Sequence, residues 1–155
     1  MDIIVVEKEK GEFMSGKSLK DICSIFNFSD LGDERGNLVV IEGGESIPFS
    51  IARVFYMYGS DSEVIRGQHA NRRSEFILIN VCGSSKVRIT DGTETVIITL
   101  DKPRMGVYIP TMVWKDMYDF SPDSILLVLS SEHYDGAEYI RDYEEYLKEM
   151  KHDDK

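Results

Sequence analysis

The sequence predicts an all-β domain, a small barrel or sandwich, followed by a C-terminal helix. Most of the chain consists of short runs rich in Val, Ile, Phe and Tyr, separated by turn residues, a pattern typical of barrels and sandwiches. From residue 136 onward the apolar residues recur every three or four positions, which is the period of an amphipathic helix. We expect a single domain, because 155 residues are enough to bury a core of their own.

The predicted strands are runs in which β-branched and aromatic residues dominate. Seven runs meet this description: residues 37–41, 51–58, 76–81, 85–90, 95–100, 106–109 and 125–131. The Asp91-Gly92 pair lies between two of them and signals a tight hairpin. Residues 17–26 (KSLKDICSIF) are compatible with a short helix. We therefore divide the chain into an N-terminal extension (1–27), a barrel (28–135), and a C-terminal helix with a charged tail (136–155). The extension is expected to pack on the barrel or to be exchanged with a second subunit.

The charge of the chain argues against general binding to nucleic acid. The net charge is −10 at pH 7, whereas a nucleic-acid-binding domain is usually basic. Between residues 53 and 115 there are nine basic and six acidic residues, a local balance of +3, so the remainder carries −13. A basic middle in an acidic protein suits an anionic small ligand. It is also compatible with basic residues that lie on strands and acidic residues that gather in the tails.

Other features of the sequence indicate a cytoplasmic protein. No apolar run reaches the roughly 20 residues that a membrane span needs. The first residues, MDIIVVEKEKGE, are too short and too acidic for a secretory signal. The two cysteines, Cys23 and Cys82, are far apart and match no metal-binding spacing.

His69 is the histidine whose surroundings indicate chemistry. It lies in RGQHANRRSEF, close to Arg66 and Arg72 and just before an apolar run. His152 is in the charged tail, and His133 follows the last predicted strand, where a structural or exposed position is expected.

The region around His69 resembles the first cupin motif. His69, Asn71, Glu75 and Gly83 occupy the places of its two histidines, its glutamate and its closing glycine, and GVYIPTMVWK (106–115) resembles the second motif. In metal-dependent cupins the two histidines, the glutamate and a last histidine bind the ion. Here Asn71 and Lys115 replace two histidines. An ammonium has no lone pair and Asn is a weak ligand for transition metals, so we expect no metal, and a metal-dependent oxygenase fits poorly.

A more specific resemblance extends from about residue 33 to 146. It is carried by DERGNLVVIE (33–42), IPFSIARVFYMY (47–58), RGQHANR (66–72), LDKPRMGVYIPTMVWKDMYDF (100–120) and LVLSSEHYDGAEYIRDYEEY (127–146). These segments are similar to the cupin-type dTDP-4-keto-6-deoxyhexose 3,4-ketoisomerases, the WxcM-like or FdtA-like family. The resemblance implies a small jelly-roll barrel, commonly a homodimer, that isomerises a nucleotide sugar without a cofactor in the synthesis of deoxysugars.

The resemblance identifies His69 as the catalytic base. The family often has a second histidine where this chain has Asn71, which cannot exchange a proton near pH 7. Candidates for the second proton handler are Tyr56, which shares one face of its strand with Tyr58, and Lys115, which is suited to steadying an enediolate. Both tyrosines are also compatible with simple packing, and Lys115 with a surface position.

The remaining candidate residues would bind the substrate. Arg66 and Arg72 are the first choices for the diphosphate, followed by Arg53, because guanidinium groups pair well with phosphate oxygens. Tyr58 and Asn71 would line the sugar site. Glu75 would orient His69 or an arginine.

Two alternatives to a ketoisomerase remain open because of Asn71. One is a cupin that binds a sugar nucleotide without isomerising it. The other is a related isomerase with an altered proton route or a different configuration at C4.

Overall fold

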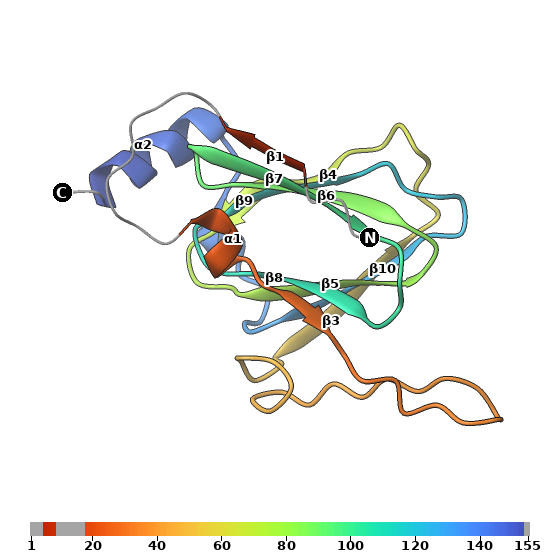
Figure 1. Cartoon of the computed structure of the whole chain (residues 1–155). Coiled ribbons are helices and arrows are strands. Elements are labelled where there is room, and N and C mark those ends of the chain that lie inside the picture. Colours follow the sequence, from red (N-terminus) through yellow and green to blue (C-terminus); the bar gives the residue numbers. More distant parts are fainter. Residues whose placement is uncertain (1–4, 9–17, 154–155) are drawn as a thin grey trace.

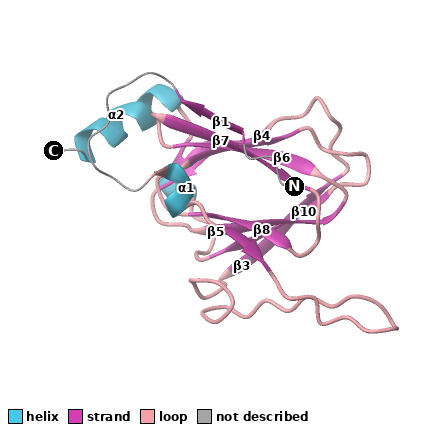
Figure 2. Ribbon diagram, viewed as in Figure 1, coloured by secondary structure: helices cyan, strands magenta, loops and turns pink. Residues whose placement is uncertain are grey.

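Two antiparallel sheets face each other in the computed structural model, which describes residues 5–8 and 18–153 (Figure 1). Coloured by secondary structure, the regular elements of this part of the chain are mainly strands, with helices gathered at one end of the barrel (Figure 2). The predicted all-β architecture with a C-terminal helix is confirmed. No helix in the described residues is long and apolar enough to cross a membrane.

One sheet has six strands and the other has five in the part of the chain that is described. The six-stranded sheet has the spatial order β1 (Val5–Lys8), β7 (Glu94–Leu100), β6 (Ser85–Thr90), β9 (Trp114–Tyr118), β4 (Arg66–Asn71) and β11 (Tyr139–Ile140). The five-stranded sheet has the order β2 (Ile25–Asn27), β8 (Met105–Ile109), β5 (Phe76–Cys82), β10 (Ile125–Ser130) and β3 (Arg53–Tyr58). The helical elements are α1 (Leu19–Ile22), the 3-10 turn η1 (Gly136–Glu138) and α2 (Tyr143–Asp153).

The main core fills the space between the two sheets. Val87 and Ile98 from the six-stranded sheet meet Leu78, Val107 and other apolar residues of the five-stranded sheet, and all are almost completely buried. Apolar side chains alternate toward this interior along the strands, as expected for sheets packed on one face. Because the core occupies only part of the barrel, the rest of the interior can hold a ligand.

The C-terminal helix packs against the six-stranded sheet through a smaller apolar cluster. Its Tyr146 is fully buried beside Trp114 and Ile140. The Tyr146 hydroxyl donates to the carbonyl oxygens of Thr90 and Met112. The helix begins at residue 143 rather than near 136, because the intervening residues form η1 and then pair with β4 as β11.

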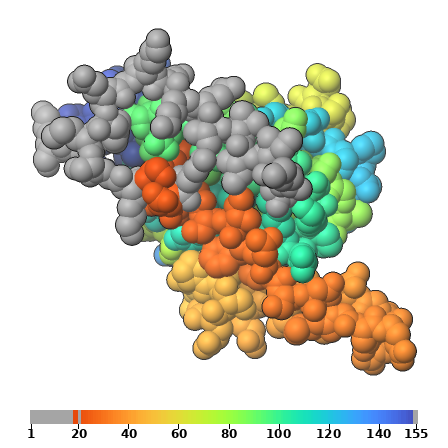
Figure 3. All heavy atoms as spheres, in the orientation of Figure 1, coloured from red at the N-terminus to blue at the C-terminus, as the bar shows by residue number. Residues whose placement is uncertain are grey.

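An arm formed by residues 28–52 projects from the barrel (Figure 1), and its tip lies well clear of the sheets in the space-filling view (Figure 3). Phe28, Ile47 and Phe49 anchor it on the outer surface of the five-stranded sheet. The predicted strand at residues 37–41 was wrong, since Val39 makes only an isolated bridge with Asp30. The run has the composition of a strand, but no strand among the described residues pairs with it.

Two further predictions about local structure need correction. The helix expected at residues 17–26 covers only Leu19–Ile22, because Ile25–Asn27 pairs with β8 instead. His69 precedes the apolar strand β5, as expected, but it lies within a strand of its own, β4, and β4 and β9 were both missing from the predicted strands. Polar residues that face the barrel interior interrupt the apolar pattern of both strands.

Candidate active site

A cavity of about 300 Å³ lies inside the barrel, and its two sides differ in chemistry. Strands β4, β9 and β11 contribute its mostly polar wall: Arg66, Gly67, His69, Lys115, Met117 and Tyr139. Strands β3, β5 and β10 contribute its mostly apolar wall: Arg53, Phe55, Met57, Phe76, Leu78 and Val128. Tyr134, from the loop after β10, completes the lining. Small-molecule sites are typically concave and largely apolar, with a few converging polar groups.

A bulge in β4 positions His69. The pairing of β4 with β9 shifts register between Gly67 and His69, and both Gly67 (φ 83°) and Gln68 (φ 55°) have left-handed backbone angles. A Cβ at residue 67 would lie 2.8 Å from the carbonyl oxygen of Lys115, so glycine is required for the close approach of the two strands. The bulge sets His69 opposite Lys115.

The hydrogen bonding of His69 shows which of its ring nitrogens is free to act as a base. Its Nδ1 lies 2.9 Å from the carbonyl oxygen of Gly67. Since a carbonyl oxygen can only accept, the neutral ring carries its proton on Nδ1 and keeps the lone pair of Nε2. Burial, together with the charge of Lys115, lowers the pKa of His69 to about 4. The ring is therefore neutral at pH 7 and able to accept a proton.

Lys115 is a buried amine on the polar wall. Only 3% of its surface is exposed. Its Nζ donates to Oδ1 of Asn71 at 2.9 Å and lies 4.4 Å from the centre of the Phe76 ring, an arrangement that favours a cation. Burial lowers the pKa of Lys115 to about 7, and the negative charge of Glu138 opposes this shift. The group can therefore change its charge near neutral pH.

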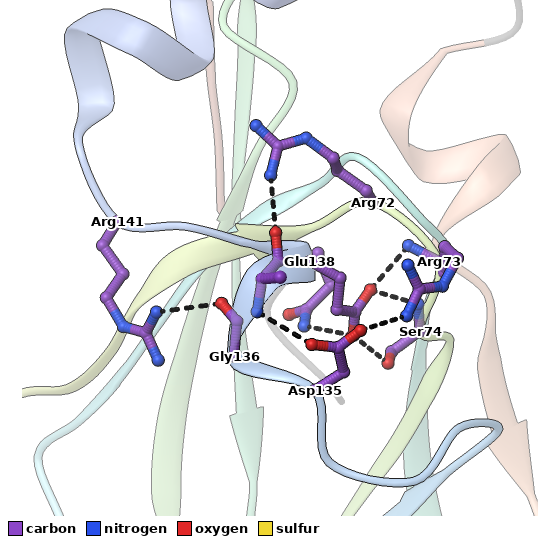
Figure 4. A network of polar contacts seen from close by, with 9 residues as sticks. Arg72, Arg73, Ser74, Asp135, Gly136, Glu138 and Arg141 are labelled. Atoms are coloured by element: carbon purple, nitrogen blue, oxygen red, sulfur yellow. Dashed lines mark hydrogen bonds and ion pairs between the residues drawn. The ribbon is translucent and has the colours of Figure 1, made fainter.

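Asn71 connects Lys115 to a buried carboxylate. Its Nδ2 donates to Oε1 of Glu138 at 2.9 Å. Glu138 also accepts from the backbone amide nitrogens of Arg73 and Ser74, at 2.7 and 3.0 Å, and from the Ser74 hydroxyl (Figure 4). These hydrogen bonds lower the pKa of Glu138 against the effect of burial. Asn71 is thus held from both sides, and it orients the amine of Lys115.

Tyr139 and Arg53 meet at one end of the cavity, and sequence reasoning missed Tyr139. Its ring centre lies 4.7 Å from that of His69, and its hydroxyl is 3.3 Å from Nη2 of Arg53. The same guanidinium reaches Oγ of Ser130 at 3.5 Å, but its buried Nε has no hydrogen-bond partner within the described part of the chain. In the sequence, Tyr139 was indicated by its position in residues 127–146, the last of the segments that resemble the ketoisomerase family.

Some predicted site residues are not brought to the cavity. Tyr56 and Tyr58 are 61% and 70% exposed on the outer face of β3, because the cavity receives the alternate residues Arg53, Phe55 and Met57. In this chain the strand therefore turns the two tyrosines away from His69.

Arg72 and Glu75 also point elsewhere. The guanidinium of Arg72 donates to Glu149 of α2 at 2.5 Å and to the carbonyl oxygen of Ala137 (Figure 4 shows the latter region). The carboxylate of Glu75 accepts from the hydroxyl of Tyr108 and does not line the cavity. Of the three predicted arginines, Arg53 and Arg66 do line it, and Nε of Arg66 donates to Oγ of Ser60 at 3.3 Å.

The cupin metal ligands are not reproduced in this geometry. Among residues 5–8 and 18–153 no group of three or more His, Cys, Asp or Glu side chains is placed to hold an ion. The side chains of Asn71 and Lys115 are hydrogen-bonded to each other, and the carboxylate of Glu75 accepts a hydrogen bond from Tyr108. The expectation of a metal-free site stays a prediction.

Comparison with known proteins identifies the family. The family model described as FdtA, WxcM-like, C-terminal matches residues 21–151. The curated TDP-4-oxo-6-deoxy-alpha-D-glucose-3,4-oxoisomerase of Aneurinibacillus thermoaerophilus is 43% identical over 124 residues, which cover 80% of this chain and 89% of that protein.

Solved structures agree with this result. WlaRA, a TDP-fucose-3,4-ketoisomerase from Campylobacter jejuni, is 41% identical with a TM-score of 0.79, covering 83% of this chain and 95% of that chain. WlaRB, a TDP-quinovose 3,4-ketoisomerase from the same organism, is 40% identical with a TM-score of 0.79, covering 81% and 97%. The predicted resemblance is confirmed, and the chain belongs to the FdtA family of WxcM-like, cupin-type sugar isomerases.

Proposed function

We propose that this chain is a 3,4-ketoisomerase that acts on TDP-4-keto-6-deoxyglucose. Its relatives of about 40% identity are named as 3,4-ketoisomerases or as a 3,4-oxoisomerase, and the Aneurinibacillus protein is named for TDP-4-oxo-6-deoxy-alpha-D-glucose. The observation that carries the proposal is the pairing of a neutral His69 with a buried Lys115 on one wall of the cavity. Moving a ketone between neighbouring carbons requires a base and a group that stabilises the developing oxyanion, and these residues supply both.

His69 is the base in this proposal. The C4 carbonyl acidifies the proton on C3, and Nε2 of His69 removes it. The electrons of the C3–H bond form a C3=C4 double bond, and the charge moves onto O4. Return of the proton to C4, with loss of the hydroxyl proton from O3, produces the 3-ketone. These reaction steps need no redox cofactor and no metal, and we propose none.

Lys115 and Tyr139 act on the oxygen atoms O3 and O4 of the substrate. The ammonium of Lys115 stabilises the negative charge on the enediolate, and Asn71 holds it in place without exchanging a proton. The hydroxyl of Tyr139, beside Arg53, gives a proton to O4 and takes one from O3. Tyr139 thereby fills the role for which Tyr56 was a candidate in the sequence.

Arg53 and Arg66 are the proposed contacts for the diphosphate. Both line the cavity. The buried Nε of Arg53, which no other described residue accepts from, is a donor that a phosphate oxygen would satisfy. Arg72 is not included because Glu149 and Glu145 already pair with it.

A second candidate function is the binding of a sugar nucleotide without isomerisation. The observation that favours it is Asn71, which stands where the cupin motif has a histidine and which is fully engaged with Lys115 and Glu138. A protein of this kind would bind TDP-4-keto-6-deoxyglucose and leave its C3 proton in place.

We also propose that the protein is a cytoplasmic homodimer. The outer face of β3 exposes Val54, Tyr56 and Tyr58, and β3 is the last strand of its sheet among residues 5–8 and 18–153. An apolar surface on an open edge favours association with a second copy. Both cysteines are free in this chain, which is compatible with a reducing compartment.

Light scattering after size-exclusion chromatography measures the mass of the protein in solution. A mass of about 35 kDa supports the dimer, and the 17.7 kDa of one chain contradicts it.

The activity is tested by incubating the protein with TDP-4-keto-6-deoxyglucose in deuterated water and recording proton NMR spectra. We expect the C3 proton signal to disappear and a 3-keto species to form. Saturable binding without exchange of the C3 proton would support the second candidate function and contradict the first.

A further inference from the structure

Glu138 is a buried carboxylate that lies behind the polar wall of the cavity. Only 1% of its surface is exposed, and it is not among the residues that line the cavity. The backbone amides of Arg73 and Ser74 and the Ser74 hydroxyl form a cradle of donors around it (Figure 4). Burial favours the neutral acid, but these hydrogen bonds and that from Asn71 outweigh it and lower the pKa of Glu138. The side chain is therefore negatively charged at neutral pH.

This carboxylate fixes which way the amide of Asn71 points. A carboxylate can only accept, so it selects the NH₂ group of Asn71, whose Nδ2 lies 2.9 Å from Oε1 of Glu138. The amide oxygen is thereby turned to Lys115 and accepts from its Nζ at 2.9 Å. Since this oxygen also only accepts, residue 115 has to present an N–H to it. The order of donors and acceptors along the chain of three side chains therefore favours a charged amine.

Glu138 is the source of negative charge at Lys115 among the described residues. No Asp or Glu in that part of the chain lines the cavity. Burial raises the pKa of Cys23 to about 12, so its thiol is neutral near pH 7, and the arginines of the cavity carry positive charge. The other titratable or charged groups around Lys115 and in the cavity are His69 and Arg66 of β4, Arg53 of β3, Tyr139 of β11, Tyr134 of the loop after β10, and Cys23 after α1.

We propose that Glu138 is a positioning residue for the isomerisation and that, through the amide of Asn71, it holds Lys115 in its charged form. The inference rests on the proposed ketoisomerase function, in which the ammonium of Lys115 stabilises the enediolate. Glu138 does not reach the substrate and acts only through these two residues. Asn71, in the place of a motif histidine, transmits an orientation and not a proton.

Two isosteric replacements separate the charge of Glu138 from its hydrogen bonds. In Glu138→Gln the new amide oxygen can stay on the backbone amides of Arg73 and Ser74, and its NH₂ group then faces Asn71. The Asn71 amide has to turn its oxygen toward that group, which leaves its own NH₂ group against Lys115, and only a neutral amine accepts from it. Adding Asn71→Asp to Glu138→Gln moves the carboxylate to position 71, where it accepts from Lys115 and from the amide at position 138.

The charge of Lys115 is measured directly by NMR. The protein is labelled with carbon-13 in its lysines, the shift of each Cε is followed against pH, and Lys115→Met identifies the signal of residue 115. In the wild type we expect a midpoint at about 7. Glu138→Gln should lower it by about one pH unit, and the double variant should return it to the wild-type value or above.

The rate of isomerisation should follow the same order. Because only the charged amine stabilises the enediolate, a midpoint about one pH unit lower makes kcat/KM of Glu138→Gln about tenfold smaller at about pH 8, with a smaller loss in more acidic solution. Ser74→Ala is the matched control, since it removes one hydrogen bond to the carboxylate but keeps the charge. It should leave the midpoint of Lys115 in place.

Three results would overturn the inference: an unchanged midpoint in Glu138→Gln, a midpoint in the double variant as low as in the single one, or an equal shift in Ser74→Ala. If circular dichroism shows that Glu138→Gln does not fold, the double variant decides, because it keeps the hydrogen bonds of the cradle, and a midpoint below that of the wild type contradicts the proposal. The titration does not depend on turnover. A wild type that leaves the C3 proton in place would contradict the ketoisomerase function, while the shifts in the variants would still decide whether Glu138 controls the charge of Lys115.

Discussion

Lys115 and His69 lie directly opposite each other on neighbouring antiparallel strands. Side chains in such positions point to the same face of a sheet, with Cβ atoms about 5 Å apart. The charge of Lys115 contributes to the lowered pKa of His69, and burial lowers the pKa of Lys115 itself. Near neutral pH the pair therefore carries at most one positive charge, on Lys115, which leaves Nε2 of His69 free to act as the base.

His69→Asn should abolish turnover and preserve the fold. The amide keeps a polar side chain of similar size but cannot accept a proton near pH 7, so we expect kcat to fall by roughly 1,000-fold, the middle of the range for general-base catalysis. The measurement is the rate of C3 proton exchange by NMR, with circular dichroism to check the fold.

His133→Asn is the matched control for this variant. His133 is exposed in the loop after β10 and does not line the cavity, so its replacement should leave the exchange rate within twofold. Exchange at the normal rate in the His69→Asn protein would remove His69 as the base.

The strands that carry the core could be predicted from sequence because their residues are apolar for a physical reason. The runs that became β5, β6, β7 and β10 bury alternate side chains between the sheets, and β5 and β10 also bury side chains under the arm. Strands β4 and β9 could not be found in this way. They carry His69 and Lys115 toward a cavity, so their inward positions are polar where the pattern for a strand expects apolar residues.

The site was predictable only in part. Alternation correctly placed Tyr56 and Tyr58 together on one face of β3, but a period of two does not say which face is buried, and the cavity receives Arg53, Phe55 and Met57 instead. The binding partner of Arg72, by contrast, is Glu149 of α2, 77 residues away. Contacts over such separations are not visible in a local pattern.

The activity should depend on pH through the charge of Lys115. Its amine faces His69, Glu138 and Cys23, and its pKa is lowered to about 7. Because the protonated form stabilises the enediolate, kcat/KM of the free enzyme should fall as the pH rises through about 7. It should also fall as the pH drops toward about 4, where His69 becomes protonated.

Lys115→Met tests this assignment. We expect kcat to fall by about 100-fold or more and the loss of activity above neutral pH to vanish. Lys86→Met is the control, since Lys86 is paired with Asp119 on the surface and its removal should leave the profile unchanged. A Lys115→Met enzyme that keeps the alkaline fall would show that another group causes it.

The same lysine should make stability depend on pH in the opposite direction from activity. Its pKa is about 7 in the folded protein and has an ordinary value of 10.5. Between these values the unfolded chain binds more protons than the folded one, so the contribution of Lys115 to stability rises with pH. Relative to Lys115→Met, the wild type should gain about 1.4 kcal/mol per pH unit from pH 7 to 9, measured by urea unfolding. A constant difference between the two proteins would contradict a shifted lysine.

Glu138→Gln should destabilise the protein although it changes few atoms. The carboxylate accepts hydrogen bonds from Asn71, Ser74 and the backbone amide of Arg73. An amide has only one acceptor oxygen, so its NH₂ group would face one of these donors, and the negative charge near Lys115 would be lost. We expect the free energy of unfolding to fall by about 3 kcal/mol.

Glu149→Gln is the control for this variant. It removes a partly exposed ion pair with Arg72 and should lower the free energy of unfolding by less than about 1 kcal/mol. Equal losses in the two variants would mean that the buried network contributes no more than a surface pair.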